Sequence, residues 1–98
     1  MNEWSVYIIK CDGRYLYTGI SIDVQRRFGE HISGNGKGSK YTKSFSSIDL
    51  VYETVIGNRS LASRIECQIK KLPKQKKELI VLSRFSRDEL IEFLGLDK

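Results

Sequence analysis

Long hydrophobic runs and metal-binding cysteine clusters are both missing from this sequence of 98 residues. The longest apolar runs, such as Leu79 to Leu82, have four residues, whereas a membrane-spanning helix needs ~18. Cys11 and Cys67 are the two cysteines, and neither has His or Cys neighbours at zinc-ligand spacing. These absences argue against a membrane span and a zinc site, and they predict two reduced cysteines in a cytoplasmic protein.

Targeting and nucleotide-binding signatures are absent as well. Glu3 stands near the start, and no basic stretch precedes an apolar one there, so we expect no secretory signal. Neither end shows a lipidation motif. The glycine-rich stretch 33–40 is basic but lacks the Gly-Lys-Ser/Thr triplet of a Walker loop. We interpret it as a flexible loop that either contacts phosphates or only connects two elements.

Positive charge, by contrast, is in surplus. Lys and Arg number 17 against 12 Asp and Glu, which gives a net charge of +5. Such a surplus suits a polyanionic partner but does not identify one. The densest basic run, at 70–77, is either a solubilising face or a nucleic-acid contact, and the sequence leaves both possibilities open.

Size and hydrophobic periodicity predict one domain spanning residues 1–98. The pattern indicates an α+β fold in which helices flank a small three-stranded antiparallel sheet, in the order β-β-α-β-α-α-α. The expected strands cover residues 4–10, 14–20 and 48–56, and the expected helices begin near residues 23, 59, 74 and 87.

The turn between the first two strands decides which side chains share a face. Asp12-Gly13 is a hairpin signal because glycine accepts positive φ without steric cost. A two-residue turn would place Tyr7 and Tyr17 on opposite faces of the sheet. A three-residue loop from Cys11 to Gly13, with Gly13 left-handed, would pair Tyr7 with Tyr17. We favour the three-residue loop.

Two further patterns concern the middle of the chain. Apolar residues occupy both alternating positions of the third strand, 48–56, which predicts a central strand covered on both faces. In the first helix, Val24, Phe28 and Ile32 recur every four residues as the expected core stripe.

Strong local signals also mark the later helices. Pro73 disfavours helical backbone at the preceding residue and predicts a stop there. Ser86 and Glu89 have the spacing of a capping box, and Gly95 is a candidate C-terminal cap. The second helix has an apolar stripe of Leu61, Ile65, Ile69 and Leu72.

Five polar side chains stand at uncommon spacing. Tyr7 and Tyr17 lie in the first two strands, Arg27 follows ten residues later, His31 comes one helical turn after it, and Glu66 lies in the second helix. Arg27 and His31 share a helix face as i,i+4 neighbours. Each residue alone has an ordinary explanation: strand tyrosines are usually packing residues, and the charged residues could form a solvated helix face or an ion pair.

In combination, these residues resemble the GIY-YIG nuclease family. Ser5-Val6-Tyr7 stands where the family has its first tripeptide, and Tyr17-Thr18-Gly19 stands at its second. The run 23–31 looks like the family's arginine helix, and Glu66 matches its metal-binding glutamate. The resemblance covers nearly the whole chain and is closest to small stand-alone members.

The resemblance implies a metal-dependent endonuclease that hydrolyses phosphodiester bonds in nucleic acid, DNA more than RNA. One tyrosine would act as general base or relay the proton, Arg27 would bind the phosphate, and Glu66 would hold Mg²⁺ or Mn²⁺. A free phenol has a pKa near ~10, so positive neighbours must lower it. The site residues are then Tyr7, Tyr17, Arg27, His31 and Glu66. The expected nucleic-acid-binding residues are Lys37, Lys40, Lys70, Lys74 and Lys77.

One departure from the family concerns activation of the tyrosine. Ile20 follows Gly19 where several relatives carry lysine. Activation would then depend on Arg27, His31 and the metal. The alternative is a nucleic-acid-binding module of the same fold with weak or no catalysis.

Overall fold

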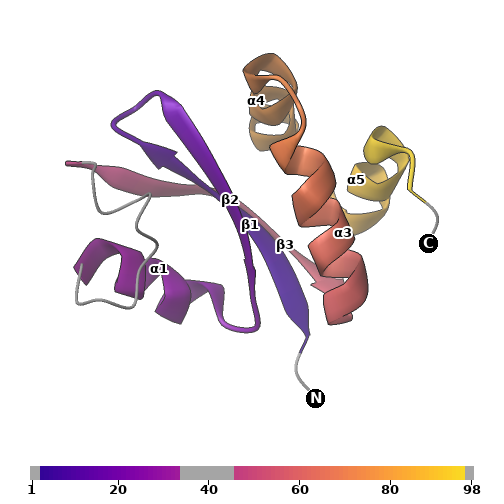
Figure 1. Ribbon diagram of the computed structural model, residues 1–98, viewed down its shortest axis with the longest axis horizontal. Coiled ribbons are helices and arrows are strands. Elements are labelled where there is room, and N and C mark those ends of the chain that lie inside the picture. Colours follow the sequence, from indigo (N-terminus) through magenta and orange to yellow (C-terminus); the bar gives the residue numbers. More distant parts are fainter. Residues whose placement is uncertain (1–2, 34–45, 97–98) are drawn as a thin grey trace.

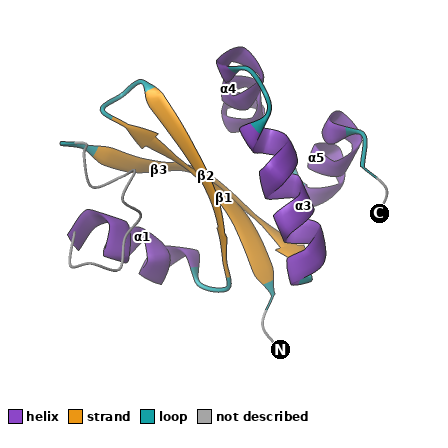
Figure 2. Cartoon of the chain, viewed as in Figure 1, coloured by secondary structure: helices purple, strands orange, loops and turns teal. Residues whose placement is uncertain are grey.

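The chain folds into a three-stranded sheet with helices on both faces, and the computed structural model describes residues 3–33 and 46–96. The order of elements is β-β-α-β-α-α-α, which confirms the predicted α+β class (Figures 1 and 2). The elements are β1 (Trp4–Cys11), β2 (Tyr15–Ser21), α1 (Val24–Ser33), β3 (Ile48–Gly57), α3 (Arg59–Lys70), α4 (Lys74–Ser83) and α5 (Arg87–Leu94).

The sheet separates two layers of helices. Both strand pairs are antiparallel, and the strands lie in the order β2-β1-β3. α1 packs on one side of the sheet, and α3, α4 and α5 lie on the other (Figure 1). β1 supplies both cores: Tyr7 and Ile9 pack with Val24 of α1, while Val6 and Ile8 pack with the helices of the other layer.

The prediction that the third strand is central was wrong, because β1 holds that position. Ile8 pairs with Tyr52 and Ile9 pairs with Leu50, so Val51 is an extra, bulged residue. The bulge reverses the alternation of faces: Leu50 packs on the α1 side, whereas Tyr52 packs on the α3 side. Even-numbered residues of β3 therefore reach both cores although the strand lies at the edge of this sheet, whereas Val55 at an odd-numbered position is exposed.

The β1–β2 loop has three residues, as predicted, but it is displaced by one position. It comprises Asp12, Gly13 and Arg14. Asp12 and Gly13 have φ values of 50° and 71°, both in the left-handed region. Glycine adopts this conformation readily, and Asp tolerates it better than most residues, which explains why the pair forms the tip.

The displaced loop changes the pairing but not the faces. Tyr17 lies opposite Ile9, and Tyr7 lies opposite Gly19, so the expected pairing of Tyr7 with Tyr17 was wrong. An odd number of loop residues nevertheless keeps the parity that we favoured. Tyr7 and Tyr17 consequently lie on the same face of the sheet, toward α1.

The predicted core stripe of α1 needs one correction. Val24 is buried, but Ile32 is 60% exposed, and His31 is the buried residue of the last turn at 3% exposure. His31 lies seven residues after Val24 and Ile32 lies eight, and both spacings return to the same helix face. The prediction chose Ile32 because it is the more hydrophobic of the two. The side of α1 that meets the sheet passes through His31 instead, where its ring contacts the two tyrosines.

Caps at the later helices follow the sequence signals. Asn58 caps α3 by accepting a hydrogen bond from the Leu61 amide. Ser86 and Glu89 form the expected capping box, and Gly95 ends α5 in the left-handed conformation. None of the helices in residues 3–33 and 46–96 combines the length and hydrophobicity of a membrane span.

Candidate active site

The Tyr7 hydroxyl lies at the centre of a polar cluster between the sheet and α1. Its Oη is 3.2 Å from His31 Nε2, within hydrogen-bonding distance. The Arg27 guanidinium also hydrogen-bonds this phenol. Tyr7 is 1% exposed, so the ring is fixed by packing and its hydroxyl is aimed by two α1 side chains. The i,i+4 spacing of Arg27 and His31 is what allows one helix face to supply both contacts.

Tyr17 joins this cluster from the edge strand β2. Its ring meets the His31 ring edge-on, with centroids 5.5 Å apart and an interplanar angle of 66°. The Lys70 ammonium of α3 lies 5.9 Å from the centroid of the Tyr17 ring. Since β2 is an edge strand of the three-stranded sheet, α3 side chains can reach the tyrosine face around it.

Glu66 brings a carboxylate to the same place. It forms an ion pair with Lys70 at 3.3 Å on the surface of α3, and its charge acts on the Tyr7 phenol. Carboxylate oxygens are the ligands that Mg²⁺ prefers, and Mg²⁺ keeps several waters when few carboxylates are present. Among the described residues, no three His, Cys, Asp or Glu side chains cluster at metal-binding distance. A single carboxylate such as that of Glu66 is a donor that a hydrated divalent ion could use.

Burial dominates the electrostatics of this cluster. It raises the pKa of Tyr7 to about 12, with the neighbouring Tyr17 adding to the rise and Arg27 opposing it. Burial together with the Arg27 charge lowers the pKa of His31, against the influence of Glu30. At pH 7 the imidazole is accordingly neutral and the phenol protonated, so one His31 nitrogen is an acceptor.

Glu30 is a functional candidate that the sequence analysis missed. Its carboxylate lies 3.1 Å from the Arg27 guanidinium and 3.7 Å from that of Arg26. Although burial works against it, the hydrogen bond to Glu30 and that to Tyr7 raise the pKa of Arg27. The ion pair with Glu30 thus holds the Arg27 guanidinium in position. The i,i+3 spacing of the two residues was the signal that could have identified it.

Gly19 has a steric role that the motif alone did not reveal. It lies opposite Tyr7 in the β1–β2 pair. A Cβ atom on Gly19 would lie 2.5 Å from Tyr7 Oη and 2.6 Å from Cζ, closer than carbon atoms tolerate. The tyrosine ring therefore crosses the backbone of β2 where only glycine leaves room.

We expect Gly19→Ala to destabilise the protein and to displace the Tyr7 hydroxyl, because the added methyl group overlaps a buried ring. Overpacking of this kind costs about 1–3 kcal/mol, and each kcal/mol lowers the melting temperature by about 4–8 °C in a domain of this size. Gly29→Ala is the matched control, since a Cβ on Gly29 meets nothing within 4 Å and alanine favours helix. Equal melting temperatures for the two variants would contradict this account of Gly19.

Three of the five predicted nucleic-acid-binding lysines lie within the described residues. Lys70 lies beside Tyr17, and Lys74 and Lys77 border a hollow next to the β1–β2 hairpin. Lys37 and Lys40 lie outside the described residues.

Ile20, whose presence put activation of the tyrosine in question, points away from the cluster. It pairs with Val6 and packs with the core on the α3 side of the sheet. A side chain at this position therefore starts on the face opposite Tyr7 and Tyr17.

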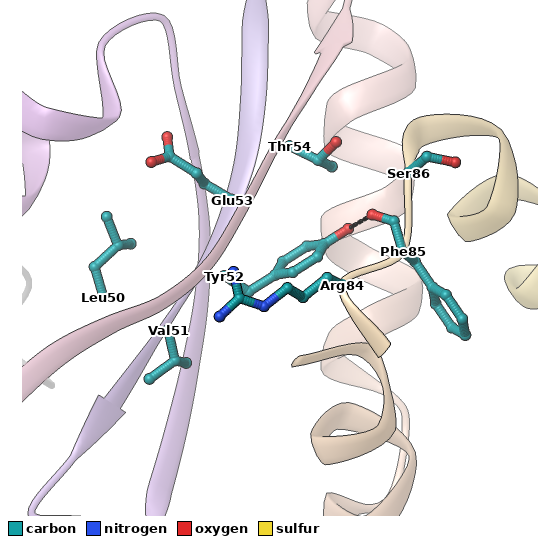
Figure 3. A pocket seen from close by; sticks show the side chains of 8 residues that line it. All are labelled: Leu50, Val51, Tyr52, Glu53, Thr54, Arg84, Phe85 and Ser86. Carbon is teal, nitrogen blue, oxygen red and sulfur yellow. Dashed lines mark hydrogen bonds between the residues drawn. The ribbon is translucent and has the colours of Figure 1, made fainter. Parts of the chain in front are cut away.

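Another hollow, of about 380 Å³, lies along β3 and the α4–α5 connection. Figure 3 shows Tyr52 crossing it, with its hydroxyl donating a 2.6 Å hydrogen bond to the Phe85 carbonyl and the Arg84 side chain beside it. None of the predicted site residues lines this hollow. Burial raises the pKa of Tyr52 to about 12 as well, but its partner is a backbone carbonyl, so we assign this tyrosine a structural role.

Comparisons with known proteins agree with the geometry. The family profile described as "GIY-YIG catalytic domain" matches residues 3–78. A UPF0213 protein of Cronobacter sakazakii is 44% identical over 81 residues, which cover 83% of each chain. UPF0213 protein YhbQ of Escherichia coli K12 is 39% identical over 94 residues, 96% of this chain and 92% of that protein.

A solved structure supports the same relationship. The solution NMR structure of the UPF0213 protein BH0048 from Bacillus halodurans is 35% identical in sequence and has a TM-score of 0.53. The match covers 99% of this chain and 100% of that one. The family profile spans well over half of the chain, and the relatives cover between 83% and 99% of it. The chain belongs to the GIY-YIG family and has the nuclease fold of its catalytic domain.

Proposed function

We propose that this protein is a metal-dependent endonuclease that hydrolyses phosphodiester bonds in nucleic acid, with DNA preferred over RNA. The observation that carries the proposal is the Tyr7 hydroxyl, held by His31 and Arg27 in the electrostatic field of Glu66. A proton acceptor, a phosphate-binding guanidinium and a carboxylate for a metal ion are the groups that phosphodiester hydrolysis requires. A role in DNA repair or processing in the cytoplasm is the setting that we propose for this activity.

Tyr7 and His31 together would handle the proton of the attacking water. In the tautomer with Nε2 unprotonated, His31 accepts the phenolic proton as Tyr7 takes a proton from the water, so Tyr7 remains neutral at the end. Such a relay avoids a free phenolate, which a pKa of about 12 makes scarce near pH 7. The hydrogen bond at 3.2 Å provides the path.

Arg27 would bind the oxygens of the scissile phosphate. Its planar fork matches phosphate geometry, and its charge persists at any working pH. Glu66 would hold Mg²⁺ or Mn²⁺, which when bound supplies positive charge to the phosphate and the leaving oxygen. The Lys70 ion pair keeps Glu66 at the surface near Tyr17.

A second candidate function is nucleic-acid binding with weak or no cleavage. The raised pKa of Tyr7 favours it, because a phenol that stays protonated is a poor general base on its own. The two functions differ in turnover and not in binding.

Purified protein incubated with plasmid, single-stranded and branched DNA should nick or cut at least one substrate with Mg²⁺ or Mn²⁺. Chelator should abolish the cleavage, and matched RNA substrates should be cut more slowly. Binding without metal-dependent cleavage on any substrate would establish the second function in place of the first, and selective cleavage of RNA would remove the assignment to DNA processing.

A further inference from the structure

The hollow next to the β1–β2 hairpin lies between the tip of that hairpin and α4. It has a volume of about 370 Å³ and is lined by Arg14, Tyr15, Leu16, Lys74 and Lys77. Small-ligand sites begin at about 300 Å³. The lining has three cationic side chains and no carboxylate. Its chemistry therefore suits an anion that carries a flat, partly apolar group.

Tyr15 gives this hollow an aromatic surface. Its side chain is 43% exposed, and the Arg14 guanidinium carbon lies 4.9 Å from the centroid of the ring. Tyrosine and arginine planes are the groups on which proteins stack unpaired bases. Arg14 is the last residue of the loop and Tyr15 is the first of β2, so the two side chains lie together at one end of the hairpin.

Hydrogen bonds to the segment before β3 hold the tip of the β1–β2 hairpin in place. The Asp12 carboxylate accepts hydrogen bonds from the amides of Ser46 and Ser47, at 3.0 Å and 2.9 Å, and the Asp12 amide donates to the Ser47 carbonyl. These bonds occupy the acidic group nearest to Arg14 in sequence. They also fix the loop, so a ligand would find the Arg14–Tyr15 pair already ordered.

The hollow and the site around Tyr7 both involve strand β2. Tyr15 and Tyr17 are alternate residues of β2, so they lie on one face and about 6.8 Å apart along the strand. Two lysines face these tyrosines from the helices: Lys70 of α3 lies near the Tyr17 ring, and Lys74 of α4 lines the hollow with Tyr15. A tyrosine of β2 and a lysine near it therefore lie together both at the candidate active site and at the hollow.

We propose that this hollow binds an unpaired nucleotide next to the scissile phosphate, with its base on the Arg14–Tyr15 pair and its phosphate against Lys74 and Lys77. A base inside a continuous duplex is stacked on both sides and has no face to offer. The substrate class is accordingly DNA with a single-stranded segment at the cleavage point. This inference rests on the proposed nucleic-acid substrate, but it concerns binding and does not require turnover.

The test measures fluorescence anisotropy in chelator, with a labelled oligothymidylate and a labelled blunt-ended duplex that carries the same number of phosphates. Tyr15→Leu removes the aromatic face and keeps an apolar side chain. Because the substitution removes the stacking of the base on the aromatic ring, we expect Tyr15→Leu to bind the single strand about tenfold more weakly. Its affinity for the duplex should be unchanged. Tyr15→Phe should behave like the parent.

The lysines are tested by charge reversal. Lys74→Glu with Lys77→Glu should weaken single-strand binding and reduce its salt slope, since each lost phosphate contact contributes about 0.7 to the slope. Arg64→Glu is the matched control, because Arg64 is an exposed helical residue that lines a different hollow. Melting temperatures of all variants exclude unfolding as the cause.

The outcomes separate this inference from the proposed activity. Unchanged single-strand affinity in Tyr15→Leu would overturn the subsite even if the parent cuts DNA, and so would equal losses on single strand and duplex. A selective loss in a protein that cuts nothing would support the subsite and refute the nuclease. Failure of the parent to bind either oligonucleotide would overturn both.

Discussion

Glu66→Gln should lower metal-dependent cleavage by orders of magnitude while the fold is nearly unchanged. Glutamine keeps the size and hydrogen bonding of the side chain but removes the negative charge that holds Mg²⁺. A bound metal supplies several kcal/mol of charge stabilisation, and each ~1.4 kcal/mol is tenfold in rate. The surface ion pair of Glu66 with Lys70 contributes only about 0.3 kcal/mol to stability. Nucleic-acid binding should persist or tighten, because a negative charge near the phosphates is gone.

Thermal melting, DNA affinity and plasmid nicking measured on one sample of Glu66→Gln separate these effects. Glu92→Gln is a suitable control, since Glu92 is an exposed glutamate of α5 and belongs to the C-terminal helix layer. If Glu66→Gln nicks as fast as the parent while both need metal, Glu66 is not the metal ligand.

Arg27→Lys should also reduce cleavage strongly, by about 10²–10³-fold, although it preserves the positive charge. The loss expected for one misplaced donor to a developing oxyanion is of this size. Lysine offers a point charge instead of a planar fork, so it cannot bond the Tyr7 phenol, the Glu30 carboxylate and a phosphate in the same arrangement. DNA affinity should fall far less than the cleavage rate.

The neighbouring arginine provides a matched control for that substitution. Arg26 lies on the same helix and also pairs with Glu30, at 3.7 Å, but its side chain is mostly exposed and makes no described contact with Tyr7. Arg26→Lys should leave cleavage close to the parental rate. Similar rates for Arg26→Lys and Arg27→Lys would show that α1 contributes charge only, and the assigned role of Arg27 would then be wrong.

Local chemistry made most of the fold predictable. The Asp12-Gly13 pair identified the hairpin, and the capping box at Ser86 and the glycine at 95 identified the ends of α5. Parity followed from the choice of a three-residue loop, because any odd loop puts Tyr7 and Tyr17 on one face, whereas Asp12-Gly13 also allowed a two-residue turn. The exact pairing of β1 with β2 could not be predicted. A three-residue loop that moves by one position changes the paired residues but leaves every side chain on the same face.

The composition of the cluster was less accessible from sequence. A hydrophobic stripe ranks Ile32 above His31, yet the helix buries His31 because its ring meets Tyr7 and Tyr17. The proximity of Glu66 depends on α3 passing the edge of β2, which no periodicity encodes. The steric need for Gly19 is likewise a property of the ring that crosses it.

The bulge at Val51 has a consequence for comparing this chain with its relatives. Alternate residues before and after Val51 face different cores: Leu50 packs on the α1 side of the sheet, and Tyr52 packs on the α3 side. A one-residue gap in an alignment across β3 would therefore mark an exchange of environments between the two ends of the strand, not merely a shorter strand. Substitution tolerance at the two ends should be compared only between sequences that share the bulge.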